Sequence, residues 1–271
     1  MLASLTLAVF APAFHYHQFG EATRMARDAG FSAVFVVGGI LAVFGTIRAF
    51  RREIESGTLE MALAHPVTRR RFFLFKTLGA FAPTALVMLA VFATSLVAVE
   101  GAAVGGRIAE RTGDIARVWG PCVAVGAAVI VLPLVIGALL NRFLRFRFVL
   151  TGVLATVLLS VAGAVWVLAR DAPTLRPLFA AALPLAFLTA LFAAAAAAFS
   201  FRFRANAAAA LTGLVALGFL PFAGNYYLAD AVANGGTVSW TYVGCSWLAL
   251  LPALAAFLVL GCLEKEEAKA S

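Results

Sequence analysis

Two hydrophobic runs of membrane-spanning length flank one charged stretch near the start of the sequence. Residues 31–50 and 77–99 are almost wholly apolar, and residues 51–76, RREIESGTLEMALAHPVTRRRFFLFK, lie between them. An α-helix needs about 20 apolar residues to cross a hydrocarbon core. The two runs are therefore predicted to be transmembrane helices, and residues 51–76 to be a loop at one membrane surface, longer than a turn requires.

Composition extends this interpretation to the whole chain. Hydrophobic residues make up 63% of the sequence and charged residues 13%, with a mean hydropathy of +0.98, whereas soluble domains are about 25% charged. Further spans are predicted over residues 1–14 (short for a span), 118–140, 149–168, 178–199, 207–222 and 240–262. The expected fold is all-α: a polytopic integral membrane protein with six to eight transmembrane helices, forming a single transmembrane domain over residues 1–271.

The centre of the charged loop has the composition of a surface helix. Residues 54–64 mix apolar with acidic and hydroxyl side chains, which suits a short amphipathic helix lying on the membrane. Pro66 would end this helix because proline lacks the backbone N–H that a helix interior needs. Thr68 could then cap the helix that re-enters the bilayer. We expect a partner in the aqueous phase to bind this loop.

The net charge of +8 indicates contact with lipid headgroups rather than with nucleic acid, because the basic residues lie at the ends of hydrophobic runs. If residues 51–76 are cytoplasmic and the spans alternate, 14 of the 21 Lys and Arg residues are cytoplasmic and 7 are not. This bias predicts that residues 51–76, 141–148, 201–206 and the C-terminus face the cytoplasm. The side chains predicted to anchor at lipid headgroups are Arg69, Arg70, Arg71, Lys76, Arg142, Arg145, Arg147, Arg202 and Arg204.

The other polar candidates fit structural roles. Cys122, Cys245 and Cys262 lie in apolar runs without metal or disulfide spacing, so we expect buried, inert thiols. His15 and His17 lack carboxylate partners at suitable spacing and are expected to be interfacial, so no metal site is predicted. Glu100 closes a predicted span and is expected to face water.

The loop resembles that of the type-2 ABC exporter permeases, in the branch that includes the membrane subunit of the nitrous-oxide-reductase maturation transporter. The resemblance rests on EIESGTLEMALAHPVTRRRFFLFK between two spans, with the family pattern at Glu55, Gly57, Thr58, Leu59, Leu63, Pro66, Thr68, Arg69 and Lys76. The chain departs from the family at Phe75, where glycine is frequent, and in a span count above the usual six.

The resemblance implies a function for the loop. Residues 51–76 would be a cytoplasmic coupling loop whose amphipathic helix docks on a cytoplasmic ABC ATPase subunit, and the whole chain would be the permease of an exporter in the inner membrane. The residues expected to contact the ATPase are Glu53, Glu55, Gly57, Thr58, Leu59, Leu63 and Pro66. A second permease copy or a homologous permease would complete the translocation path. ATP and Mg would bind to the ATPase, so no cofactor is expected on this chain, which would not itself be an enzyme.

The sequence agrees with the assignment of ATP hydrolysis to a separate subunit. The sequence contains no G-x-x-x-x-G-K-[ST] phosphate loop, so hydrolysis by that route needs another subunit. Two alternatives stay open: a non-transporting membrane anchor of a larger complex, and an integral-membrane lipid-modifying enzyme. The enzyme would need a cluster of His, Asp or Glu at one membrane face, for which the sequence offers only His15, His17 and Glu21.

Overall fold

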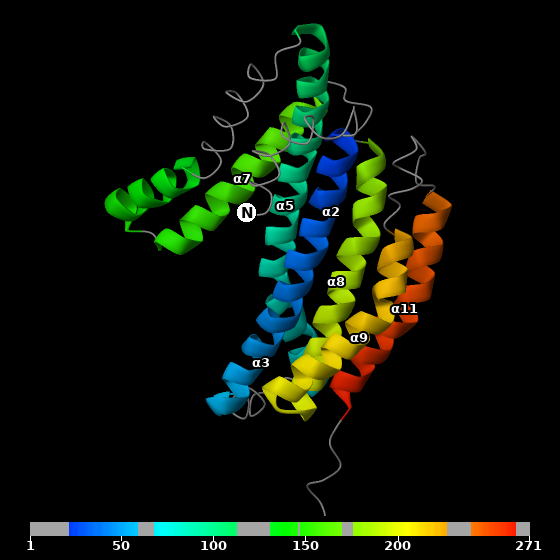
Figure 1. Cartoon of the computed structure of the whole chain (residues 1–271). Helices are drawn as coiled ribbons and strands as arrows, with labels where there is room; N and C mark the ends of the chain where they lie inside the picture. Colours follow the sequence, from blue (N-terminus) through cyan, green and yellow to red (C-terminus); the bar gives the residue numbers. More distant parts are fainter. Residues whose placement is uncertain are drawn as a thin grey trace, which may run out of the picture. The chain divides into compact units, whose positions relative to one another are not determined.

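The computed structural model of the chain describes residues 22–58, 68–112, 131–145, 147–169, 176–226 and 240–263. Within these ranges the chain is helical and contains no strand (Figure 1). The elements are α2 (Ala22–Ile40), the π-helical turn η1 (Leu41–Gly45), α3 (Thr46–Glu55), α5 (Arg69–Thr112), α7 (Phe148–Leu168), α8 (Arg176–Arg202), α9 (Ala205–Tyr226) and α11 (Trp240–Cys262). A shorter apolar helix covers Val131–Leu144.

Five helical segments in the described ranges are long and apolar enough to cross a membrane. They are Ala26–Glu55, Arg70–Val104, Phe148–Leu168, Leu178–Arg202 and Val243–Cys262, and Val131–Leu144 and Ala205–Phe219 are shorter apolar helices. The prediction of an all-α polytopic membrane protein is therefore confirmed. The first predicted span, over residues 1–14, and the first part of the span predicted over residues 118–140 lie outside the described residues.

Helix α5 is much longer than the span predicted from its hydrophobic run. Its 44 residues extend about 66 Å at 1.5 Å per residue, whereas a hydrocarbon core is about 30 Å thick. The helix does not end near Glu100, which is half-buried within it, but continues to Thr112. Ala, Glu and Arg are strong helix formers, and their presence in residues 100–112 allows the helix to continue beyond the hydrophobic run.

The chain divides into two compact units. Unit 1 comprises Met1–Val36, Leu86–Ala182 and Ala229–Thr237. In its core, Ala33 and Val34 of α2 pack with Met88 and Val91 of α5. The ring of Phe92 also contacts the rings of Phe31 and Phe179, with centroids 6.2 and 5.5 Å apart. Apolar packing therefore joins α2, α5 and the first part of α8 in this unit.

Small and hydroxyl residues bring further helices of unit 1 together. Thr94 of α5 donates a hydrogen bond of 3.2 Å to Ser160 of α7. A Cβ added at Gly137 would lie 3.3 Å from the backbone nitrogen of Gly152, so the helix over Val131–Leu144 and α7 approach closely at a pair of glycines. Such close approach through small residues is typical of helices packed in membranes.

Unit 2 comprises Val37–Ala85, Leu183–Leu228 and Val238–Ser271, and it contains the predicted coupling loop. Its centre is the alanine-rich part of α8, where residues 193–198 are all buried. Alanine has no side-chain atom beyond Cβ, so other helices can approach the backbone closely. The side chains that pack there are Ile47 and Phe50 of α3, Phe73 of α5, Ala208 of α9 and Phe257 of α11. Helix α8 is therefore the central element of unit 2.

Candidate functional site

The span that precedes the coupling loop continues into it. Helices α2 and α3 with η1 between them form one continuous helical segment that ends at Glu55. Ile54 and Glu55, expected to begin a separate surface helix over residues 54–64, are instead the last residues of α3. Hydrogen bonding within α3 extends the transmembrane helix into the loop, so the loop begins with an ordered turn rather than at the membrane boundary.

Gly57 ends this helix. The Ser56 N–H donates to the Arg52 carbonyl at 3.1 Å and the Gly57 N–H to the Ile54 carbonyl at 3.4 Å. Gly57 has φ +70°, the left-handed conformation that residues with a Cβ adopt at an energetic cost. Glycine at this position after a helix allows the chain to turn while the last carbonyls of the helix keep partners. The Gly-Thr pair of the family pattern therefore has a structural role at the end of α3.

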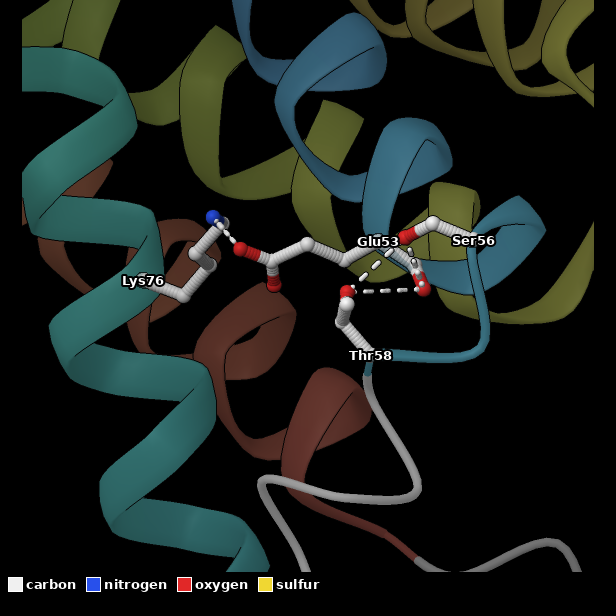
Figure 2. A network of polar contacts seen from close by, with 4 residues as sticks. All are labelled: Glu53, Ser56, Thr58 and Lys76. Atoms are coloured by element: carbon white, nitrogen blue, oxygen red, sulfur yellow. Dashed lines mark hydrogen bonds and ion pairs between the residues drawn. The ribbon is translucent and has the colours of Figure 1, made fainter.

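Two hydroxyl groups complete the turn around the backbone of Glu53. The Ser56 Oγ and the Thr58 Oγ1 donate to the Glu53 carbonyl at 3.3 and 3.4 Å, and the two hydroxyl oxygens lie 2.9 Å apart (Figure 2). This carbonyl belongs to the last turn of α3, where carbonyls lack partners within the helix. The hydroxyls therefore satisfy a helix end and fix the direction in which the loop leaves α3.

An ion pair joins the two ends of the loop. The ammonium of Lys76 on α5 contacts the carboxylate of Glu53 on α3, as Figure 2 shows. Both side chains are partly shielded from solvent, with 26% of Lys76 and 31% of Glu53 exposed. Glu53 was predicted to contact the ATPase and Lys76 to anchor at headgroups, but in this arrangement each side chain is engaged by the other. Glu55, by contrast, is exposed.

Three phenylalanines from three helices pack together, and two of them lie close in sequence to the two ends of the loop. The rings of Phe50 (α3), Phe73 (α5) and Phe201 (α8) lie with centroids 5.3–5.8 Å apart in all three pairings. Phe50 and Phe73 are only 2% and 0% exposed. A Cβ added at Gly261 of α11 would overlap the Phe73 ring, so α11 lies directly against this cluster. We call Phe50, Phe73 and Phe201 the phenylalanine cluster.

Arg202 ties the end of α8 to the end of α11. Its Nη2 donates to the Leu260 carbonyl at 3.1 Å, and the side chain is half-buried. A basic side chain near a helix C-terminus stabilises the carbonyls there. Arg202, predicted to anchor at headgroups, therefore makes an internal contact. Together, the ion pair, the phenylalanine cluster and Arg202 connect the loop with α3, α5, α8 and α11.

The structure describes some of the remaining predicted site residues and leaves others out. The side chains of Thr58, Arg70, Arg71, Arg142, Arg145, Arg147 and Arg204 are all exposed, as contact with headgroups or a partner requires. The Thr68 carbonyl accepts a hydrogen bond from the Phe72 N–H at 3.0 Å, so Thr68 directly precedes the first turn of α5, as predicted. Leu59, Leu63, Pro66 and the side chain of Arg69 lie outside the described residues.

The cysteines and the alternative enzyme site are also only partly described. Cys245 is exposed on α11 and Cys262 is half-buried, so burial was predicted wrongly for Cys245, which the helices in the described ranges leave uncovered. The described ranges contain no group of three His, Cys, Asp or Glu side chains arranged to hold a metal ion. Cys122, His15, His17 and Glu21 lie outside those ranges.

Sequence reasoning missed the phenylalanine cluster, although a local signal was present. Each ring lies within four residues of an arginine at a predicted membrane boundary, in RAFRR, RRRFF and FSFRF. The arginines are typical of lipid headgroup contacts, whereas the aromatic residues beside them pack inside the protein. Because burial of a large ring contributes more than an exposed charge, these phenylalanines mark where the helix ends meet.

Comparison with known proteins gives one match. A family model described as "ABC-2 family transporter protein" matches residues 5–261, which include most of both units and all of residues 51–76. No curated protein and no solved structure matched the chain. The match agrees with the resemblance inferred from residues 51–76.

Proposed function

As a member of the ABC-2 family, this multi-pass membrane protein is the permease subunit of an ABC transporter, and we propose that it works in an ATP-driven exporter. In this proposal a separate cytoplasmic ATPase docks on residues 51–76, and its ATP-dependent movement drives the permease. The ATPase holds ATP and Mg. The lack of a G-x-x-x-x-G-K-[ST] phosphate loop in these 271 residues supports the separate subunit.

One observation carries the proposal: both ends of the loop are held firmly to the helices. The Glu53–Lys76 ion pair joins α3 to α5, and the phenylalanine cluster joins both of these helices to α8. Close-packed cores transmit displacement because their side chains have little free volume into which they can yield. A force applied to the exposed part of the loop would therefore act on three membrane helices together, as coupling requires.

Glu55 and Thr58 are the described residues that we assign to the ATPase contact. Both are exposed, and Glu55 directly precedes the turn formed by Ser56 and Gly57. Gly57 shapes this contact rather than forming it, since its positive φ sets the path of the chain. We assign Leu59, Leu63 and Pro66 to the same contact on the family resemblance.

The rest of the assembly follows from the family resemblance. We propose that two copies of this permease, or one copy and a homologous permease, bind two ATPase subunits in the inner membrane. Residues 51–76, 141–148, 201–206 and the C-terminus would face the cytoplasm, in agreement with the bias of Lys and Arg. We also propose kinship with the branch that contains the membrane subunit of the nitrous-oxide-reductase maturation transporter, on the pattern in residues 51–76.

Purification of the full chain with its native partners tests this function. Mild detergent extraction should yield a complex with an ATP-binding subunit, and addition of the permease should stimulate ATP hydrolysis by that subunit. A stable permease that transports without any ATPase would overturn the proposal. A complex in which bound ATPase neither hydrolyses faster nor alters the permease on ATP addition would identify a non-transporting anchor instead.

A further inference from the structure

Helix α3 packs against the beginning of α9 in unit 2 (Figure 1), and four arginines of the sequence belong to α3 or directly precede α9. Ile47 of α3 packs with Ala205 and Ala208 of α9. Arg48 directly follows Ile47, Arg51 lies one helical turn further on, and Arg204 directly precedes Ala205. Arg52, four residues after Arg48, adds a fourth positive charge on the exposed side of α3. Helical spacing of three and four residues thus places Arg48, Arg51 and Arg52 on neighbouring positions of one side of α3.

These arginines lack anionic partners in the described part of the chain. None of the four forms an ion pair there, and the carboxylate of Glu53 is engaged by Lys76. Glu55 lies one turn beyond Arg51 but forms no ion pair with it. The Arg51 Nε is also excluded from solvent and has no hydrogen-bond partner among the residues that the structure describes. A buried N–H without an acceptor is costly, whereas the residue as a whole is only half-buried, so Arg51 remains partly accessible to an acceptor from outside the chain.

Exposed apolar side chains lead up to the arginines along both helices. On the helix that runs through η1 into α3, Ile40 is 53% and Phe44 59% exposed, and Arg48 and Arg52 follow at intervals of four residues. On α9, Leu214 and Leu217 are more than 60% exposed, and Arg204 directly precedes the first residue of that helix. A change from apolar to arginine along an exposed helix face is typical of the passage from acyl chains to headgroups.

We propose that Arg48, Arg51, Arg52 and Arg204 bind the phosphate of an anionic phospholipid, in the leaflet nearest the loop over residues 51–76. The acyl chains of this lipid lie along the apolar faces that contain Phe44 and Leu214. Guanidinium groups match phosphate oxygens in pairs, and basic pockets between membrane helices bind anionic headgroups. A soluble protein would cover the arginines but not the apolar residues that precede them, so the lipid accounts for both observations.

The site is independent of the proposed ATPase docking. The docking contact is assigned to Glu55, Thr58 and the residues that follow, whereas the lipid site uses the arginines one to two turns before Glu55 on α3 and Arg204 beside α9. Either proposal can therefore fail without the other. The bound lipid would cover the junction of α3 and α9 and stabilise it from outside.

Native mass spectrometry of the full-length protein tests the lipid site, with phosphatidylglycerol and phosphatidylcholine of identical acyl chains as probes. The triple variant Arg48→Gln, Arg51→Gln, Arg204→Gln removes three of the four arginines. Each arginine near an anionic lipid surface contributes roughly fivefold to affinity, so the triple variant should bind phosphatidylglycerol about 100-fold more weakly. Wild-type protein should prefer phosphatidylglycerol to phosphatidylcholine.

A matched control comes from unit 1. Arg142→Gln, Arg145→Gln, Arg147→Gln removes three exposed arginines that also form no ion pair in the described residues and that are predicted to meet headgroups from one short stretch of chain. Its affinity for phosphatidylglycerol should fall several-fold less than that of the first variant, because general charge attraction is lost in both variants and the lipid site only in the first. An equal loss in both triple variants would show general charge attraction and overturn the site. If the first variant does not accumulate, Arg51→Gln alone should weaken binding about fivefold, and unchanged binding would overturn the site.

Two further outcomes distinguish other ligands. Millimolar inorganic phosphate should leave phosphatidylglycerol bound, because phosphate lacks acyl chains to compete for the apolar faces. Displacement by phosphate, together with equal binding of both lipids, would identify a free-phosphate site. Loss of ATPase with full retention of phosphatidylglycerol in the Arg48, Arg51, Arg204 variant would assign the arginines to the ATPase. Either result would contradict the lipid site.

Discussion

Lys76 of α5 pairs with Glu53 of α3 across 23 positions of sequence, and this pair joins the two ends of the coupling loop. The same glutamate accepts hydrogen bonds from Ser56 and Thr58 through its backbone carbonyl. Side chain and backbone of one residue therefore fix both the end of α3 and its distance from α5. A loop fixed in this way can pass a displacement to the membrane helices instead of absorbing it.

Removal of the Glu53–Lys76 ion pair by substitution should loosen the loop and lower the free energy of unfolding modestly. Both charges are about one-quarter to one-third exposed, and pairs of this kind contribute up to about 1 kcal/mol. A double-mutant cycle with Glu53→Gln and Lys76→Met should give a coupling of roughly 0.5–1 kcal/mol in the free energy of unfolding in detergent. Proteolysis within residues 51–76 should accelerate in either single variant. Additive effects, with proteolysis unchanged, would show that the pair does not hold the loop.

Gly57→Ala should destabilise the turn through the backbone alone. A Cβ at Gly57 meets nothing within 4 Å, so no clash complicates the result. The positive φ should nevertheless cost about 1–2 kcal/mol for alanine. Gly79→Ala is the matched control, because it also has open space but lies inside α5 with ordinary φ. The unfolding temperature should therefore fall in Gly57→Ala and not in Gly79→Ala. Equal effects at the two positions would contradict a left-handed turn at Gly57.

Gly261→Ala should disrupt the phenylalanine cluster. The added Cβ would overlap the Phe73 ring, which is fully buried and cannot move without disturbing Phe50 and Phe201. Overpacking of this kind costs about 1–3 kcal/mol. Gly244→Ala in the same helix has open space and should be neutral or slightly stabilising. The comparison is measured as the difference in unfolding temperature, and no difference between the two variants would argue against contact between α11 and Phe73.

The hydrophobic runs predicted the fold class well because the bilayer imposes one length and one backbone solution on every span. They predicted helix ends poorly. Helix α5 continues past Glu100 and α3 continues through Glu55, since hydrogen bonding within a helix persists where the hydrophobic run has stopped. The charge pattern likewise placed the connection between α3 and α5 within residues 51–76 but did not predict its internal contacts.

Pairings between distant residues could not be predicted from one sequence. Lys76 and Arg202 both appeared to be headgroup anchors, yet one contacts Glu53 and the other the Leu260 carbonyl. These roles depend on which helix ends meet, and that is decided by packing of residues such as Phe50, Phe73 and Ala197. Gly57 was recognised only through the family pattern, while its left-handed conformation gives the physical reason for glycine there.

Inversion of the basic cluster at the start of α5 should affect membrane insertion rather than ATPase docking. Arg70 and Arg71 are exposed, and with Arg69 they form the densest positive charge beside a predicted span. Replacement of all three by Glu should lower the amount of protein in the membrane or reverse its local orientation, because positive charge directs topology. Replacement by Lys keeps that signal and should restore normal amounts. Equal membrane abundance and orientation in the Glu and Lys variants would contradict this role.

The most direct test of ATPase docking is the charge reversal Glu55→Lys, with membrane abundance measured beside co-purified ATPase. Glu55 is exposed at the end of α3, so the substitution should change folding stability by no more than about 0.5 kcal/mol. At an interface, however, reversal places like charges together at a cost of several kcal/mol. Glu55→Asp, which keeps the charge, should retain the ATPase. We predict normal membrane abundance of Glu55→Lys with most of the ATPase lost; full ATPase binding and full stimulated hydrolysis in this variant would contradict docking on the coupling loop.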